Sequence, residues 1–184
     1  QIFDKAVSVA GSISDDSFKA WALRDIASEL AKAGQTQQAL LIFDKAFNAA
    51  GSISDDFIKA KALSNIASGL AKAGQFDKAF DVAMSISDDS KKASTLKDIA
   101  VELAKAGQFD KAFNVAGSIS FDFLKADTLK DIAVELAKAG QTQQALLIFD
   151  KALNVAGFIY YNYDKAKALK DIASELAKAG QTQK

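Results

Sequence analysis

Apolar residues recur at every third or fourth position along much of this chain, which is the spacing of one face of an α-helix. In residues 88–107 the apolar positions are Leu96, Ile99, Ala100 and Leu103. Asp88 and Asp89 favour the positive end of a helix dipole, and Gly107 can take the left-handed conformation that stops a helix. We therefore predict a helix over these residues, the A helix, with Ser87 as its N-cap.

A second and shorter amphipathic run follows Gly107 after one further residue. Its apolar positions are Phe109, Ala112, Phe113, Ala116 and Ile119. We predict a B helix here, packed back against the A helix. The small side chains of Ala100 and Ala112 would let the two helices approach closely.

The same helix pair recurs along the chain. The A-helix phrase Asp-Ile-Ala, or Asn-Ile-Ala in one copy, begins at Asp25, Asn65, Asp98, Asp131 and Asp171, with spacings of 40, 33, 33 and 40 residues. Periods in this range are typical of solenoids, in which each unit is too small to bury its own apolar face and stacks on its neighbours. The sequence thus predicts an all-α fold in which antiparallel helix pairs form a solenoid.

We expect a single repeat domain over residues 1–184. Its parts are a partial B helix at 1–13, units at about 15–53, 55–86, 88–119 and 122–158, and a final A helix at about 162–180. The long units carry seven extra residues in the B helix, within Gln35–Ala46 and Gln141–Ala152. Seven residues are about two helical turns, so the B helix lengthens by roughly 10 Å while its apolar face stays in phase.

This arrangement of large and small apolar residues resembles the tetratricopeptide repeat family. The positions that carry the resemblance are Leu96, Ile99, Ala100, Leu103, Gly107, Phe109, Ala112 and Ala116, and in the long unit Ala39, Phe43 and Ala46. The resemblance covers essentially the whole chain. It implies a right-handed superhelix whose A helices line a concave groove, where extended or helical peptides bind.

The A-helix positions that lie off the packed stripe would face this groove. They are Trp21, Arg24, Ser28, Lys61, Ser64, Ser68, Ser94, Lys97, Val101, Asp127, Lys130, Val134, Lys167, Lys170 and Ser174. Four of the five units place Arg or Lys at the middle position. One interpretation is a mildly basic groove for an acidic or carboxylate-terminated protein segment. The other is a solvated helix face with local charge pairs.

A cluster of aromatic residues interrupts the repeat at the fifth junction. It contains Phe158, Tyr160, Tyr161 and Tyr163, where other junctions carry small and acidic residues. Such rings are typical contact anchors and predict a second contact site. Alternatively, the rings cover Phe149 and Leu153 and extend the core. Trp21, the single tryptophan, has the same two interpretations: a binding role, or packing over the neighbouring helix.

Composition narrows the function classes. The chain has 23 basic and 23 acidic residues, which argues against nucleic acid as a partner. Its alternating period argues against an RNA-reading repeat.

The chain contains neither cysteine nor histidine, so we expect no catalytic residues, no metal site and no cofactor. The paired aspartates are better explained as helix caps. No apolar run of 18 residues is present, so we expect no membrane span; a soluble, cytoplasmic protein is favoured, although the compartment stays open.

We therefore predict a non-enzymatic scaffold that binds a protein or peptide in its groove, with an acidic segment as one candidate. The alternative is a structural or self-assembling segment of a longer array with no dedicated ligand. Gln1–Ala6 matches the second half of a long B helix, and the final A helix would leave Leu169, Ile172 and Leu176 partly uncovered. Head-to-tail or dimeric association through such open ends is the expectation that goes with this alternative.

Overall fold

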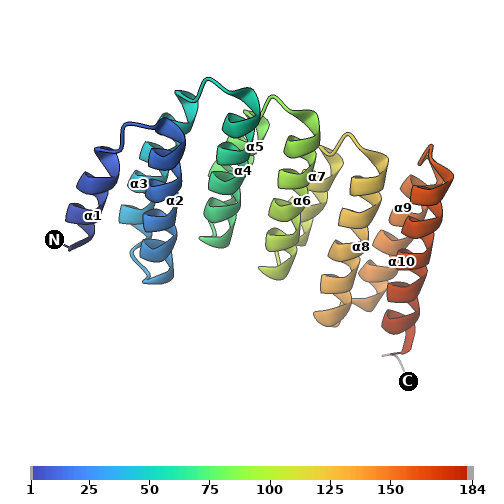
Figure 1. Cartoon of the computed structure of the whole chain (residues 1–184). Helices are drawn as coiled ribbons and strands as arrows, with labels where there is room; N and C mark the ends of the chain where they lie inside the picture. Colours follow the sequence, from blue (N-terminus) through green and yellow to red (C-terminus); the bar gives the residue numbers. More distant parts are fainter. Residues whose placement is uncertain (1, 182–184) are drawn as a thin grey trace. The chain divides into compact units, whose positions relative to one another are not determined.

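The structure is a computed structural model that describes residues 2–181, and within these residues all regular secondary structure is α-helical. Figure 1 shows the helices in chain order. They are α1 (Ile2–Gly11), α2 (Asp16–Lys32), α3 (Thr36–Gly51), α4 (Asp56–Lys72), α5 (Phe76–Met84), α6 (Asp89–Lys105), α7 (Phe109–Gly117), α8 (Asp122–Lys138), α9 (Thr142–Gly157) and α10 (Asn162–Gln181). The all-α prediction is confirmed.

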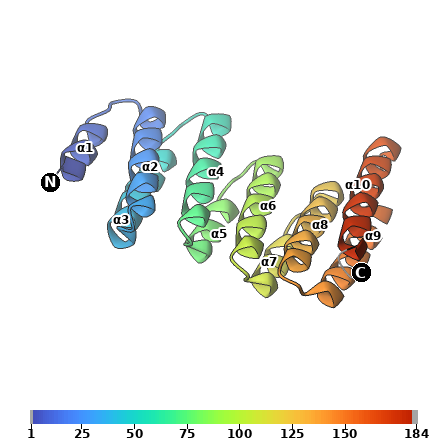
Figure 2. The ribbon, with the colours of Figure 1, turned by 90° about the horizontal axis from the view of Figure 1, so that it is seen from below.

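The chain forms two compact units, an N-terminal unit of Gln1–Thr95 and a C-terminal unit of Leu96–Lys184, with the boundary inside α6. In the N-terminal unit α2 packs on α1, α3 and α4, and α4 also packs on α3 and α5. In the C-terminal unit α8 packs on α7, α9 and α10, and α9 packs on α10. Figure 2 shows these neighbours from below. The expectation of one domain over residues 1–184 stays a prediction.

Aspartate side chains close the N-termini of several A helices. The Asp15 carboxylate accepts hydrogen bonds from the amides of Ser17 and Phe18, and Asp55 accepts one from the Ile58 amide at 2.8 Å. In α6 the cap is Asp88, which accepts from the Lys91 amide at 2.6 Å, so the prediction of Ser87 is wrong by one residue. The first aspartate of each pair is thus a helix cap, as expected.

The A helices end in a common turn at a glycine. The Gln35 amide donates to the Leu30 carbonyl at 2.9 Å, and the Gly34 amide donates to the Ala31 carbonyl at 3.0 Å. This is the Schellman arrangement, which requires a left-handed residue after the helix. It recurs at Gly74, Gly107 and Gly140, all with φ near +75°. In contrast, α10 continues through Gly180 to Gln181.

The predicted apolar face of the third A helix is buried, and so are Ala112, Ala116 and Ile119 of the following B helix. Phe113 is an exception, because its ring stays partly exposed beneath the Lys151 ammonium, 5.4 Å from the ring centroid. The seven-residue extension is confirmed, since α3 and α9 have 16 residues whereas α5 and α7 have 9.

Gly69 lies inside α4, where most A helices carry glutamate. A Cβ atom at this position would lie 2.9 Å from Cε1 of the buried Phe43 ring and 3.3 Å from the Ser28 hydroxyl. The glycine therefore allows α3 and α4 to approach closely. Its role is in packing rather than in stopping a helix.

Candidate functional site

The most clearly formed hollow among the predicted groove residues lies between α2 and α4 in the N-terminal unit. This α2–α4 pocket has a volume of about 310 Å³. It is lined by Ser17, Phe18, Ala20, Trp21, Arg24, Ile58, Lys61, Ala62, Asn65 and Ile66. Three predicted groove residues, Trp21, Arg24 and Lys61, are brought together here.

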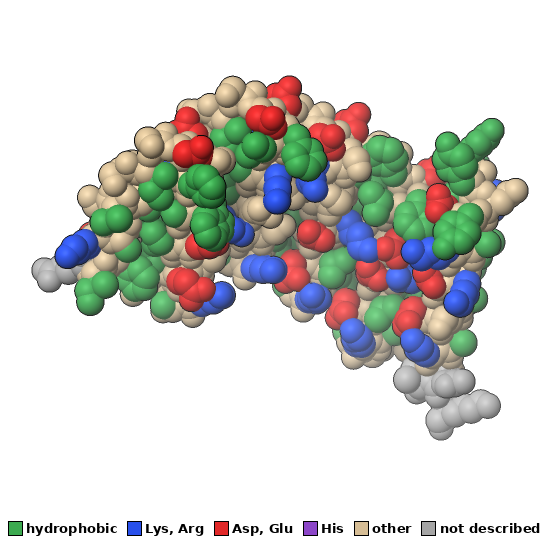
Figure 3. All heavy atoms as spheres, in the orientation of Figure 1, with side chains coloured by type: hydrophobic (Ala, Val, Ile, Leu, Met, Phe, Trp, Pro, Cys, Tyr) green, Lys and Arg blue, Asp and Glu red, His purple; other side chains and the backbone are tan. Residues whose placement is uncertain are grey.

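The wall of the α2–α4 pocket is largely apolar and accessible. Phe18, Trp21 and Ile58 are 60%, 55% and 43% exposed, and Ile66 is buried behind them. Phe57, next to Ile58, is also exposed. Figure 3 shows hydrophobic side chains gathered over α2 and α4 with basic side chains beside them. Trp21 therefore packs toward the neighbouring helix and at the same time presents accessible ring surface.

Two cations border this apolar wall. Nε of Arg24 lies 2.9 Å from Asp25 Oδ1, in an ion pair that lacks hydrogen-bond geometry. Within residues 2–181, the Arg24 side chain donates no hydrogen bond, and the Lys61 ammonium has neither an ion-pair nor a hydrogen-bond partner. A guanidinium in this state can still receive a carboxylate on its free edge.

The predicted serines do not join the pocket. The Ser28 hydroxyl donates to the Arg24 carbonyl, Ser94 donates to the Lys91 carbonyl, and Ser64 accepts a 2.8 Å hydrogen bond from the buried Thr95 hydroxyl. These contacts lie within helices or between packed helices. Ser68 is half-buried, and Ser174 is exposed on α10.

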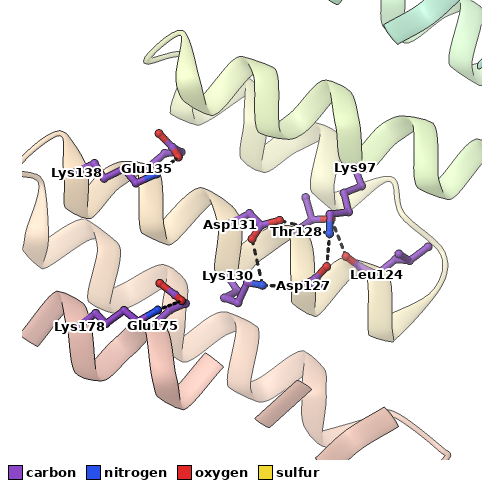
Figure 4. Close-up of polar contacts among 10 residues, drawn as sticks. All are labelled: Lys97, Leu124, Asp127, Thr128, Lys130, Asp131, Glu135, Lys138, Glu175 and Lys178. Atoms are coloured by element: carbon purple, nitrogen blue, oxygen red, sulfur yellow. Dashed lines mark hydrogen bonds and ion pairs between the residues drawn. The ribbon is translucent and has the colours of Figure 1, made fainter. Parts of the chain in front are cut away.

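The predicted groove residues of α6 and α8 form a closed ion-pair network instead, drawn in Figure 4. Nζ of Lys97 contacts the Asp127 carboxylate and lies 3.4 Å from Asp131 Oδ2. Nζ of Lys130 lies 2.6 Å from Asp127 Oδ1 and 3.2 Å from Asp131 Oδ1. Two lysines therefore face two aspartates, and their formal charges cancel.

The network favours the charged forms of Lys97, Lys130 and Asp127. Partial burial alone would lower the pKa of Lys97 and Lys130, but the hydrogen bonds and charges of Asp127 and Asp131 outweigh it and raise both above 10.5. Burial likewise opposes the charged form of Asp127, but hydrogen bonds from Lys130 and Lys97 lower its pKa below 3.8. For Lys97 and Lys130, the structure therefore agrees with the interpretation as local charge pairs.

The remaining predicted positions of the C-terminal unit are dispersed. Val101 and Val134 are half-buried, and Lys170 is exposed. The Lys167 ammonium lies 5.7 Å from the centroid of the Phe123 ring, in a cation–π contact. A continuous basic column is therefore absent from the described part of this unit.

Helices α8 and α10 repeat α2 and α4 with an offset of 106 residues. Arg24 and Lys61 correspond to Lys130 and Lys167, so both helix pairs carry a cation at each of these two positions. The apolar and neutral residues Trp21, Ile58 and Asn65 correspond to Asp127, Asp164 and Asp171. The α8–α10 pair thus has three carboxylates at the positions where the α2–α4 pair has residues that line the pocket.

Sequence reasoning missed Phe18, Ile58 and Asn65. The first two lie in the first turns of their helices, outside the central positions assigned to the groove. The sequence did contain a signal for Phe18 and Ile58: they are apolar at a position where the third A helix carries the charged residue Lys91. Asn65 could have been noticed because it replaces the aspartate that the other four units carry at this position.

The aromatic cluster at residues 158–163 lies on the surface. Phe158, Tyr160, Tyr161 and Tyr163 are 77%, 88%, 68% and 79% exposed. The rings of Tyr160 and Tyr161 meet edge to face with centroids 5.3 Å apart. The expectation that these rings extend the core is wrong, because the buried residue of this junction is Ile159.

The apolar face of α10 is only partly open. Leu169 is exposed and Leu176 is half-buried, in agreement with the expectation of an uncovered helix. Ile172, however, is fully buried, because α10 packs on both α8 and α9. The prediction is wrong at this residue.

No protein-family model matches the chain, and no curated protein matches it in sequence. Among solved structures it is similar to the crystal structure of Ton1535 from Thermococcus onnurineus NA1, with 19% sequence identity and a TM-score of 0.41. That match covers 96% of this chain and 76% of the other. This similarity is too distant to transfer a family or a function, so the function has to be argued from the residues of this chain.

Two further findings concern only residues 2–181. None of the helices there combines the length and the apolar character needed to cross a bilayer. No group of three or more His, Cys, Asp or Glu residues is placed to hold a metal ion.

Proposed function

We propose that this chain is a non-catalytic protein-interaction module of the tetratricopeptide-like kind, with its helix pairs stacked as a right-handed α-solenoid. Its α2–α4 pocket binds a partner segment that carries an apolar side chain next to a carboxylate. The recurring helix pairs, their shared glycine turns and the packing of successive pairs within each unit support the architecture.

The observation that carries the binding proposal is the state of the two cations at the pocket. Arg24 is ion-paired with Asp25 but its side chain donates no hydrogen bond, and Lys61 is unpaired within the described residues, while an accessible apolar wall lies beside them. At the equivalent positions of α8 and α10, Lys130 is engaged by aspartates and Lys167 by Phe123. The α2–α4 pair offers the unpaired Lys61 and an apolar surface together.

The expected ligand follows from the energetics of these two parts. Burying a side chain the size of leucine or phenylalanine contributes about 1.5–3 kcal/mol, and a hydrogen bond to a charged group contributes about 1.5–3 kcal/mol. Neither part alone gives a useful affinity after the cost of ordering a peptide. The ligand therefore needs an apolar anchor and an acidic group within one or two residues of each other.

Trp21 provides the test, because it is the single tryptophan and lines the pocket. Peptides that combine Leu, Phe or Tyr with Asp or Glu are titrated into the chain while tryptophan fluorescence is recorded. We expect saturable binding that weakens at least 10-fold in an Arg24→Gln, Lys61→Gln variant.

The matched control is a Lys167→Gln, Lys170→Gln variant, which removes the same charge from α10. It should bind as the wild type does. Equal losses in both variants would indicate general charge attraction and would overturn the assignment of the pocket. Circular dichroism confirms that all proteins remain helical.

A further inference from the structure

The junction between α9 and α10 carries a cluster of accessible aromatic residues. Within residues 158–164 four rings are mostly exposed. The equivalent junctions at 11–16 and 51–56 read Gly-Ser-Ile-Ser-Asp-Asp and contain no ring. An apolar surface of this kind needs a partner if it is to be removed from water.

The same junction also carries a carboxylate. Asp164 follows Tyr163 in the first turn of α10, and within the described residues it has no ion-pair partner. The junction therefore combines aromatic side chains with an unpaired negative charge. This is the complement of the α2–α4 pocket, which combines an apolar wall with the unpaired Lys61 ammonium and with Arg24, whose side chain donates no hydrogen bond to its ion-pair partner Asp25.

We propose that the α2–α4 pocket of one molecule receives the aromatic junction, residues 158–164, of a second copy of this chain. One or two of the exposed rings fill the space between Trp21 and Ile58, and the Asp164 carboxylate pairs with Arg24 or Lys61. This inference rests on the proposed function, because it names the segment that the pocket binds.

The symmetry of such a contact determines how assembly proceeds. The pocket and the junction are different surfaces, so the contact is heterologous and leaves a free pocket at one end and a free junction at the other. Further copies can add at both ends. One segment in one pocket buries less than the roughly 1,200 Å² of a standard stable interface, so we expect weak association that grows with concentration.

Complementation between two variants tests the proposal. Trp21→Ala with Ile58→Ser removes the pocket, and Tyr160→Ser with Tyr161→Ser removes the junction. Sedimentation velocity of the wild type should show species that grow with concentration, whereas each variant alone should stay monomeric. An equimolar mixture of the two variants should form a dimer that does not grow further, because only one productive contact remains.

A Leu169→Lys variant is the matched control, since it changes the exposed apolar residue of α10 and leaves both proposed surfaces intact. It should assemble as the wild type does. Loss of assembly in this variant alone would overturn the proposal in favour of stacking through the α10 face.

A wild type that stays monomeric at millimolar concentration would also overturn the proposal. Peptide binding measured on the junction variant separates this failure from a failure of the proposed function. If acidic aromatic peptides still bind there, the pocket is a binding site whose ligand is not a second copy. Circular dichroism of every variant confirms that loss of assembly is not loss of fold.

Discussion

The α2–α4 pair and the α8–α10 pair occupy equivalent places in the repeat, yet their surfaces differ in chemistry. Both carry a cation at the positions of Arg24 and Lys61. In α8–α10, Asp127 stands where α2 has Trp21, and it pairs with Lys97 and Lys130. Carboxylates in place of the pocket wall thus separate a surface of paired charges from one with an unpaired lysine.

This comparison shows that a repeated helix fixes the placement of a side chain and not its role. Lys130 and Arg24 lie in the same register, but one is held by two aspartates and the other keeps most of its donors free. Charge counts along a helix face do not distinguish these states. The distinction depends on what the next helix places opposite each cation.

The largest effect is expected when the surface of the α2–α4 pair is converted into that of the α8–α10 pair. Changing Trp21→Asp, Ile58→Asp and Asn65→Asp gives α2–α4 the three carboxylates of α8–α10. We expect peptide binding to fall by at least about 50-fold, because both the apolar wall and the net positive charge are lost. Since Trp21 is replaced, the measurement is calorimetric titration.

An Asp127→Asn, Asp171→Asn variant serves as the control for this exchange. It alters the registers of Trp21 and Asn65 in the C-terminal unit, outside the proposed aromatic junction, and should leave binding unchanged. If the control loses affinity as well, the two units do not act separately in binding.

The second test removes Asp127, which pairs with Lys97 and Lys130. Asp127→Ala should lower the free energy of unfolding by about 1–3 kcal/mol, because two partly buried lysines lose their shared partner. Asp25→Ala, which removes the half-exposed carboxylate of a single ion pair without a hydrogen bond, should cost no more than about 1 kcal/mol. Chemical denaturation measures both. Similar costs for the two variants would contradict the distinction between a closed network and a single ion pair.

The third test concerns packing beneath these surfaces, where α4 has Gly69 and α10 has Glu175 at the equivalent place. In Gly69→Ala the new methyl group meets the Phe43 ring, which costs about 1–3 kcal/mol and outweighs the gain of about 1 kcal/mol in helix propensity. We expect a net destabilisation on the order of 1 kcal/mol, seen as a lower denaturation midpoint.

Two variants sharpen this third result. Gly117→Ala, where a Cβ atom meets nothing within 4 Å, should not destabilise the chain. Adding Phe43→Leu to Gly69→Ala should make the two changes non-additive, because the smaller side chain removes the collision. Additive effects would mean that contact with the Phe43 ring is not the reason why Gly69→Ala is destabilising.

The smallest effect is a pH dependence confined to the network. The pKa of Asp127 is lower in the folded chain, so its contribution to stability is present above its ordinary value of 3.8 and is lost as pH falls through the folded value. The pKa values of Lys97 and Lys130 are raised, so their contributions are present below 10.5 and are lost as pH rises above it.

Unfolding curves of the wild type and of Asp127→Asn at pH 7 and at about pH 3 measure this effect. The difference in stability between them should be largest at pH 7 and should shrink at the lower pH, where the wild-type carboxylate takes up a proton. A constant difference would show that Asp127 acts through packing rather than through its charge.

Much of the fold was predictable because its determinants are local. The apolar spacing of Leu96, Ile99 and Leu103 defined a buried face, and Gly107 defined the end of the helix, with no information about neighbours. The N-cap was misplaced because Ser87 and Asp88 are both good caps, and the choice depends on the backbone turn. Local chemistry alone therefore fixes such boundaries to within a residue.

The candidate site was only partly predictable, because it depends on which side chains of two helices face each other. The positions Trp21, Arg24 and Lys61 were identified on single helices, but Ile58 joins them only through the packing of α4 on α2. The pairing of Lys97 with Asp127 likewise crosses between helices. Periodicity gives the face of one helix and does not give these cross-helix pairs.

The glycine turns at the ends of the A helices join residues that are close in sequence, which favours rapid local folding. The Gln75 amide and the Leu70 carbonyl that it bonds are only five residues apart, and each A helix packs mainly on helices close to it in sequence. Contacts of such short sequence separation are formed early and rapidly. Folding can therefore begin within a helix pair, so that the local turn forms before more distant parts of the chain pack.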